Sequence, residues 1–220
     1  MTTASTQPGN RLDRRKARTR AALIRAAQTL IAEGRTNVPI LEITKAADVG
    51  MGSFCNHFET KEQLFDAAVE AVMDAYGQLL DRVTGRIEDP AEVFAASFRL
   101  TGRLHRREPE LSKVLLNNAL QLLTAANGLA PRARRDIEAA TKSGRFDVTD
   151  LDLAVTMAAG ALIALGQLLH DQPERDVDET TDRVTEDLLR MFGVPRRQAR
   201  QICSLPLPEV DAAGDDGSAA

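Results

Sequence analysis

Apolar residues recur at intervals of three and four along most of this chain, and this spacing places them on one face of an α-helix. The longest run extends over about six helical turns and consists of Phe65, Val69, Val72, Tyr76, Leu79 and Val83. Aromatic residues, which favour strands, make up only 4% of the chain, and tryptophan is absent. The pattern therefore predicts an all-α fold, and 220 residues suffice for one or two domains.

Capping and helix-breaking residues predict where the helices begin and end. A first helix is expected from Arg15 to Gly34, and a long one begins at the capping box Thr60 to Gln63. The same signals predict starts at Asp89-Pro90, Pro109, Pro131 and Thr149, helices over 150–170 and 177–192, a stop at Gly193, and a short helix over 195–204.

Two short helices joined by a tight turn are predicted between residues 40 and 58. Pro39 suits the first helical position, Asp48 to Met51 forms the turn, and a third helix covers Gly52 to Phe58. The positions expected to face inward are apolar: Ile40, Ile43, Val49, Phe54 and Phe58. Those expected to face outward are polar or small except for Met51: Met51, Gly52, Ser53, Asn56 and His57. This arrangement is typical of a helix-turn-helix, whose second helix enters a DNA major groove about 12 Å wide.

The charge is divided unequally along the chain. Residues 1–61 contain 10 Lys and Arg against 5 Asp and Glu, a balance of +5, whereas residues 62–220 contain 18 against 27, a balance of −9. A basic head on an acidic body suits a chain in which only the head contacts nucleic acid. A solvated basic tail at Arg11 to Arg20 is the alternative explanation for part of this charge.

The stretch from Ile43 to Glu62 resembles the signature of the Tet repressor (TetR) family. The matching features are Val49 before the third helix, Gly52-Ser53-Phe54 within it, His57-Phe58 at its end and Thr60-Lys61-Glu62 at the start of the fourth. The resemblance is strong over residues 15–70; beyond them only the length, the helix count and the phrase Gly144-Arg145-Phe146 are similar.

The resemblance implies a DNA-binding regulator rather than an enzyme, with no cofactor. It implies a three-helix N-terminal helix-turn-helix domain and a C-terminal helical domain for ligand binding and dimerisation. We expect a disordered basic arm (1–14), a DNA-binding domain (15–61), a ligand-binding and dimerisation domain (62–204) and a disordered tail (205–220). The expected function is that of a repressor released from a palindromic operator by a small apolar ligand.

Two residues depart from the family pattern. Cys55 stands where a tyrosine that touches the DNA backbone is usual, and a thiol is a weak donor. Asp48 replaces the usual turn glycine, so modest strain is expected if its φ is positive. A redox role for Cys55 is disfavoured, because nearby phosphate would oppose a thiolate.

The family pattern assigns DNA contacts to particular residues. Ser53, Asn56, His57 and Lys61 are expected to contact phosphate or sugar, and Met51 and Gly52 lie nearest the base edges. The predicted DNA-binding set also includes Arg14, Arg15, Lys16, Arg18 and Thr44. Asn56 has the alternative of reading adenine, and His57 that of packing locally at the helix end.

The body is expected to contain the ligand site and the dimer interface. Candidate ligand-lining residues are Met73, Tyr76, Phe94, Phe98, Leu104, His105, Leu115, Asn118, Leu122 and Met157. Any single one of them is more simply explained as core. Helices 150–170 and 177–192 are predicted to form a four-helix interface with a second copy, because the first is rich in alanine and leucine around Gly160.

Other classes of protein fit the sequence less well. Cys55, Cys203 and three histidines offer neither metal-ligand spacing nor a disulfide framework, and a reducing cytoplasm is expected. No signal peptide is recognised, and Leu153 to Leu169 suits a buried interface helix better than a membrane span. A helical enzyme lacks recognisable catalytic motifs. A helical dimer that binds ligand or protein without DNA stays as the other alternative.

Overall fold

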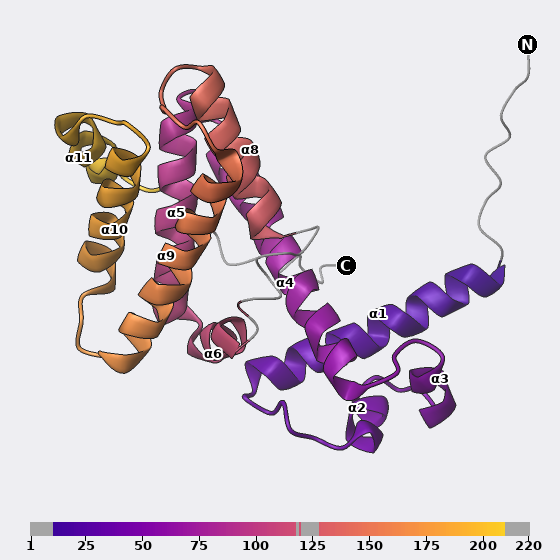
Figure 1. The fold of residues 1–220 in the computed structure, drawn as a ribbon. Coiled ribbons are helices and arrows are strands. Elements are labelled where there is room, and N and C mark those ends of the chain that lie inside the picture. The colour runs from indigo at the N-terminus through magenta and orange to yellow at the C-terminus, as the bar shows by residue number, and fades with distance from the viewer. Residues whose placement is uncertain (1–10, 118, 120–127, 210–220) are drawn as a thin grey trace, which may run out of the picture. The chain divides into compact units, whose positions relative to one another are not determined.

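The computed structural model describes residues 11–117, 119 and 128–209, and within them every regular element is a helix (Figure 1). The all-α prediction is thereby confirmed. In chain order the helices are α1 (Arg11–Ala32), α2 (Ile40–Ala46), α3 (Met51–Cys55), α4 (Lys61–Thr84), α5 (Pro90–Arg107), α6 (Pro109–Asn117), α8 (Leu129–Lys142), α9 (Leu151–Asp171), α10 (Val177–Met191) and α11 (Arg196–Ser204). The chain forms two compact units, residues 1–72 and 73–220, here called the head and the body.

The head is built on the apolar stripe of α1. Its buried residues are those that the sequence predicted: Leu23, Ala26, Ala27, Leu30 and Ile31. The helix ends at Ala32, and Gly34 closes the following turn: its φ is 71°, its N–H donates to the Ile31 carbonyl at 2.9 Å, and the Arg35 N–H donates to the Leu30 carbonyl at 2.7 Å. α1 begins at Arg11, so residues 11–14 are helical rather than part of a disordered arm.

Helices α2 and α3 pack through three buried side chains. Ile43 and Phe54 are 0% and 1% exposed, and Phe58 packs against Phe54 with ring centroids 6.0 Å apart. Ile40 and Val49, also predicted to face inward, are only half-buried. α3 is shorter than expected because its helical pattern ends at Cys55, and Asn56 to Phe58 form a turn closed by the Phe58 N–H on the Phe54 carbonyl.

Side-chain caps start several helices. Thr60 accepts from the Gln63 N–H at 3.2 Å, and the Gln63 amide accepts from the Glu59 N–H, a variant of the predicted capping box. Asp89 caps α5 before Pro90, as predicted. The cap of α9 is Asp150 rather than Thr149, because the Asp150 carboxylate accepts from the Leu153 N–H at 3.0 Å.

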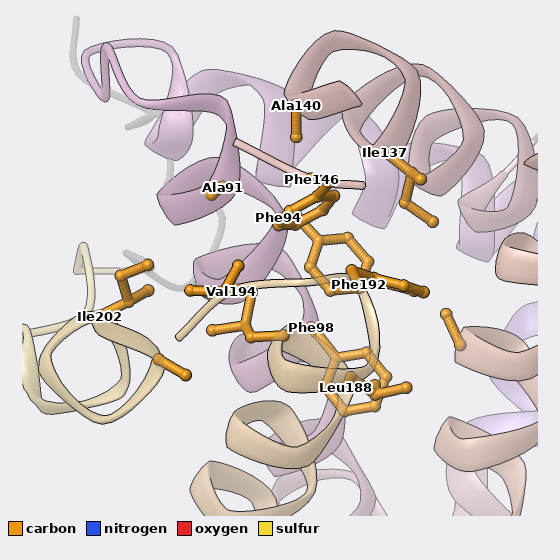
Figure 2. Packing of buried hydrophobic residues seen from close by; sticks show 14 of the residues in the cluster. Ala91, Phe94, Phe98, Ile137, Ala140, Phe146, Leu188, Phe192, Val194 and Ile202 are labelled. Atoms are coloured by element: carbon orange, nitrogen blue, oxygen red, sulfur yellow. The ribbon is translucent and has the colours of Figure 1, made fainter. Parts of the chain in front are cut away.

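Four phenylalanines form the centre of the body core (Figure 2). Phe94 lies edge-on to Phe146 and Phe192, with centroid distances of 5.7 and 5.5 Å, and Phe98 extends the group along α5. The segment Gly144-Arg145-Phe146 supplies one of these rings and an ion pair, since Arg145 binds the Asp89 carboxylate at 2.7 Å. Backbone bonding from Asp147 to the Phe192 carbonyl then joins this segment to the end of α10.

A buried ion pair holds the C-terminal part of the body in place. Arg99 on α5 donates to both carboxylate oxygens of Asp182 on α10, at 2.7 and 3.1 Å, and to the Leu205 carbonyl at 2.9 Å. Leu205 to Glu209, predicted to belong to a disordered tail, therefore begin as an ordered segment held against α5. Arg103 adds a second bond to Asp182 and an ion pair with Asp178.

Candidate functional site

The turn between α2 and α3 sets the direction of the second helix. Asp48 has a φ of 53°, the one positive value among the described residues other than glycine, which confirms that it takes the place of a turn glycine. The chain reverses there through hydrogen bonds from Asp48 to the Lys45 carbonyl and from Val49 to the Thr44 carbonyl. The turn is thus closed by backbone bonds and does not depend on the Asp48 side chain.

The outer surface of α3 is small and open. Met51 is 45% exposed, Gly52, Cys55 and Asn56 are exposed, and Ser53 is half-buried. The turn after α3 carries Asn56 and a half-buried His57, so these two side chains extend from a loop rather than from helical turns. The structure therefore groups most of the predicted α3 contacts on one accessible surface.

The head also carries basic residues on α1 and at the start of α4. Lys61, in the first turn of α4, donates to the Asn37 side chain at 3.2 Å, a contact between residues far apart in the sequence. Arg14, Arg15, Lys16 and Arg18 are all exposed on α1. Arg20, which the sequence analysis did not select, lies over the Phe58 ring at 5.3 Å.

Thr44 does not belong to this surface. It is 2% exposed, and its hydroxyl donates to the Leu41 carbonyl at 3.0 Å. The expectation that Thr44 contacts DNA is wrong for that reason. A threonine in a short helix commonly bonds its own backbone in this way, and Thr44 lies on the buried face of α2, which leaves it almost no access to solvent.

The predicted ligand-lining residues fall into different environments. Phe94 and Phe98 belong to the phenylalanine core, and Met73 and Leu104 are also buried. Tyr76 and Leu115 are half-buried, and burial raises the pKa of the Tyr76 phenol to about 12. Met157 is 42% exposed on the outer side of α9, away from the buried candidates. Asn118 and Leu122 lie outside the described residues.

His105 occupies a tight site between three helices. Its Nδ1 is 2.7 Å from the hydroxyl of Ser112 on α6, and its ring lies so close to α9 that a Cβ on Gly166 would meet it at 2.4 Å. Its buried Nε2 has no hydrogen-bond partner among the described residues. Burial lowers the pKa of His105, so the imidazole is neutral near pH 7.

A charged network between α4 and α8 was not selected from the sequence. Arg132 packs against Gly77, and a Cβ added to Gly77 would lie 2.6 Å from the Arg132 guanidinium. Arg132 also forms ion pairs with Asp74 at 3.0 Å and with Asp81 at 2.9 Å. It also donates to the Gly128 carbonyl at 2.7 Å. Met73 adjoins this network, because a Cβ added to Gly128 would lie 3.4 Å from the Cβ of Met73.

The network continues through Arg135 to a buried carboxylate. Arg135 bonds Asp81 at 2.7 Å and donates twice to Oδ1 of Asp136, whose side chain is only 7% exposed. Burial raises the pKa of Asp136, and the bonds from Arg135 only partly oppose this. Burial also acts to raise the pKa of Asp81, but the bonds from Arg135 and Arg132 outweigh it and leave that pKa lowered. The two carboxyls that share Arg135 therefore differ in the direction of their pKa shifts.

The outer face of α9 is apolar and largely uncovered. Leu153 and Met157 are 55% and 42% exposed, Gly160 is exposed on the same face, and Met191 on α10 is 42% exposed. By length and composition α9 would suffice to cross a membrane, a test that core and interface helices also pass, and only 28% of its most apolar stretch is buried. This face has the character of a surface that another helix covers.

A helix-turn-helix head with an open polar helix, joined to an all-helical body with buried polar groups, defines a DNA-binding transcriptional regulator. Comparison with known families identifies which kind. Residues 23–68 match the family model described as bacterial regulatory proteins, tetR family, and residues 89–205 match that of the Tetracyclin repressor-like C-terminal domain. The chain belongs to the TetR family.

Solved structures agree with this assignment. The chain is 38% identical to RolR in complex with the ligand resorcinol, with a TM-score of 0.70 and coverage of 90% of this chain and 98% of that one. Against RolR without ligand the identity is 39%, the TM-score 0.76, and the coverage 87% and 99%. A TetR-family regulator from Pectobacterium atrosepticum shares the fold at 20% identity, with a TM-score of 0.62 and coverage of 84% and 96%. None of the curated proteins compared with the chain matches it.

Proposed function

We propose that this regulator is a cytoplasmic repressor that binds a palindromic operator as a homodimer and leaves it when a small hydroxylated aromatic ligand binds the body. The observation that carries the DNA-binding part is the exposed surface of α3, which is polar or small apart from Met51, together with the exposed basic residues that α1 carries in the same compact unit. Such a surface suits a helix that enters a major groove. We assign DNA binding to residues 15–61 together with the basic part of α1 before them.

The DNA contacts divide into two kinds. Ser53, Asn56, His57 and Lys61 hold phosphate or sugar, while Met51 and Gly52 face the base edges, and the arginines of α1 add backbone or minor-groove contacts. Phosphate contacts release counterions, so each is expected to appear in the salt dependence of binding. Cys55, in place of a hydroxyl donor, contributes little to these contacts.

The dimer is proposed to form through the uncovered face of α9 together with α10. Helix α9 exposes large apolar side chains beside Gly160, which permits a second helix to approach closely. The residues after the head, 62–204, would then serve both dimerisation and ligand binding. A two-fold dimer requires an operator with two-fold symmetry.

The ligand chemistry is proposed from the α4–α8 network. RolR, which resembles this chain over nearly its whole length, binds resorcinol. Asp136 receives both of its Arg135 hydrogen bonds at Oδ1, so Oδ2 is suited to accept from a phenolic hydroxyl. Met73 beside the network offers an apolar contact for the ring. The sequence suggested a small apolar ligand, and we propose that this ligand carries hydroxyl groups on an aromatic ring.

DNA binding is tested with DNA that the protein selects from a random pool. The selected sequences should form a palindrome, and the logarithm of the binding constant should fall steeply with the logarithm of salt concentration. Lys61→Met should weaken binding and reduce the salt slope by about one. Selection without symmetry would contradict the dimer proposal, and a failure to select any sequence would contradict operator binding.

Ligand binding is tested by calorimetry with resorcinol, using 1,3-dimethoxybenzene as a probe without hydroxyl donors. We expect resorcinol alone to bind and to release the selected DNA, and Asp136→Asn to weaken both effects at least about tenfold, the loss of one charge-assisted hydrogen bond. Asp152→Asn is the matched control, since Asp152 on α9 is 83% exposed and pairs with an arginine of α8, Arg134. Equal responses of the two variants would refute the assignment of Asp136.

A further inference from the structure

Helix α6 is docked on the body through a polar contact. Ser112 is 4% exposed and is the one fully buried residue of α6 among those whose side chains the structure describes. The apolar residues of this helix, by contrast, are only half-buried: Leu111, Leu115 and Leu116. The Ser112 hydroxyl lies 2.7 Å from Nδ1 of His105 on α5. Half-buried leucines stabilise docking less than fully buried ones, so the position of α6 depends on this hydrogen bond.

The His105 ring also lies directly against α9. A Cβ added to Gly166 would lie 2.4 Å from Cε1 of His105 and 2.7 Å from each of its ring nitrogens, so the ring fits only because residue 166 is glycine. Nε2 is buried and has no hydrogen-bond partner among the described residues. The junction of α5, α6 and α9 therefore depends on one imidazole with a single hydrogen-bonded nitrogen.

The described charged groups on α5 and α6 offer no counter-ion to a proton on this ring. The arginines that α5 carries near His105 in sequence have the same sign as a protonated imidazole: Arg103, Arg106 and Arg107. Glu110 on α6 is paired with Lys113 at 2.8 Å, and Glu108, which precedes the helix, is exposed. A proton on His105 would therefore meet like charges and carboxylates already engaged with a cation or with solvent.

The groups on α9 do not compensate such a proton either. His170 and Asp171 are exposed, and the Asp171 carboxylate accepts from Gln167 at 2.9 Å. The backbone carbonyl of Leu162 favours a protonated ring, but burial outweighs it, and the pKa of His105 is lowered. Burial disfavours the charged form of a histidine unless a partner compensates for the lost hydration. The docked junction therefore holds a neutral ring.

We propose that His105 is an acid-sensitive latch: while its ring is neutral it holds α6 against α5 and α9, and binding of a second ring proton releases α6. Release of α6 lets water reach the imidazole, where the charged form is stable. Because the docked ring binds a proton more weakly than the released ring, acidification shifts the population towards the released state. None of the residues proposed above to contact DNA or ligand takes part, so the body would respond to acid independently of its effector.

The size of the effect follows from the uptake of one proton. A solvated histidine has a pKa of about 6.5, and that of the docked His105 is lower. Between these two values the docking equilibrium changes by up to about tenfold for each unit of pH. Above about pH 7.5 both forms of the ring are neutral. Docking of α6 is therefore stable in neutral solution and weakens as the pH falls below about 6.5.

Hydrogen exchange of the α6 amides between about pH 7.5 and about pH 5, corrected for the intrinsic exchange rate, measures this release. We expect protection of α6 in the wild type to fall by up to about tenfold per pH unit below about pH 6.5, while protection of α10 changes little. His105→Asn places an uncharged amide group near the position of Nδ1 and should lose the pH dependence. His170→Asn is the matched control, because it removes an exposed histidine of α9 and should respond as the wild type does.

Protection of α6 that does not change with pH in the wild type, or that falls equally in His105→Asn, would overturn the proposal. A parallel loss of protection in every helix would also overturn it, because it would indicate global unfolding by acid. If His105→Asn does not fold, an NMR titration of the His105 ring in the wild type decides: a midpoint below about 6.5 supports the latch, and an ordinary midpoint refutes it. Ser112→Ala tests the hydrogen bond itself and should speed α6 exchange already in neutral solution; unchanged exchange would show that Ser112 does not hold the helix.

Discussion

The buried ion pair between Arg99 and Asp182 allows an unequal effect of mutating its two partners to be predicted. The Arg99 side chain is 6% exposed, whereas that of Asp182 is 29% exposed and also contacts Arg103. Replacing Asp182 by asparagine keeps the shape but leaves the charged Arg99 guanidinium buried without a counter-ion. Replacing Arg99 by methionine instead removes the buried charge and fills much of its volume.

The magnitudes follow from these exposures. Breaking a buried pair by removing one partner costs about 3–5 kcal/mol, and the partial exposure of Asp182 places Asp182→Asn near the lower end, about 3 kcal/mol. Arg99→Met should cost about 1–2 kcal/mol, because Asp182 keeps Arg103 and solvent, and the Leu205 carbonyl can be hydrated. The double variant should resemble Arg99→Met, since asparagine costs little once the buried guanidinium is gone.

Urea unfolding followed by circular dichroism measures these differences, with all variants at one protein concentration because a dimer's stability depends on it. Unchanged m-values with shifted midpoints would permit the free energies of unfolding to be compared directly. An Arg99→Met variant as unstable as Asp182→Asn, or more so, would refute the reasoning from burial.

Three further predictions concern the turn, the dimer and the effector site. Asp48→Ala should be less stable than Asp48→Gly by about 1 kcal/mol in thermal unfolding, because alanine tolerates the positive φ poorly; equal stabilities would argue against strain in the turn. Gly160→Leu should shift the protein from dimer to monomer in sedimentation, and a persistent dimer would place the α9 contact elsewhere. Asp136 has a raised pKa in the folded state, so it contributes stability at acidic pH that is lost as pH rises through that pKa. Asp136→Asn should therefore gain stability relative to wild type as the pH rises above the ordinary aspartate pKa of about 4, until the folded carboxyl is fully ionised; a constant difference in the free energy of unfolding would contradict this.

Local patterns in the sequence predicted much of the head and several helix starts in the body. The stripe of Leu23, Leu30 and Ile31 and the caps at Thr60 and Asp89 depend on residues within a few positions of one another. Short-range sterics and hydrogen bonds decide such features, and a pattern of residue types records them. The same patterns placed the α9 cap at Thr149 instead of Asp150, since adjacent capping residues compete and only the geometry of the turn selects one.

Contacts across the body required the tertiary structure. Arg132 lies over Gly77 and reaches Asp81, 51 residues away in sequence, and nothing in the spacing of these residues marks them as neighbours. Thr44 was assigned to the DNA surface because its position in the motif is recognisable, whereas its burial on the inner face of α2 is not. Met157 was grouped with the buried ligand-lining candidates for the same reason, because the spacing of apolar residues does not show which face of a helix packs against the core of its own chain.

The sequence by itself determined the all-helical fold, the helix-turn-helix and the family, because periodicity and capping are local properties of the chain. Only the tertiary structure decided which polar groups are buried, which glycines face a neighbour and which face open space. These features depend on how helices distant in sequence pack together, and packing fixes the desolvation that shifts the pKa of Asp136 and the clearance at Gly166 that admits the His105 ring.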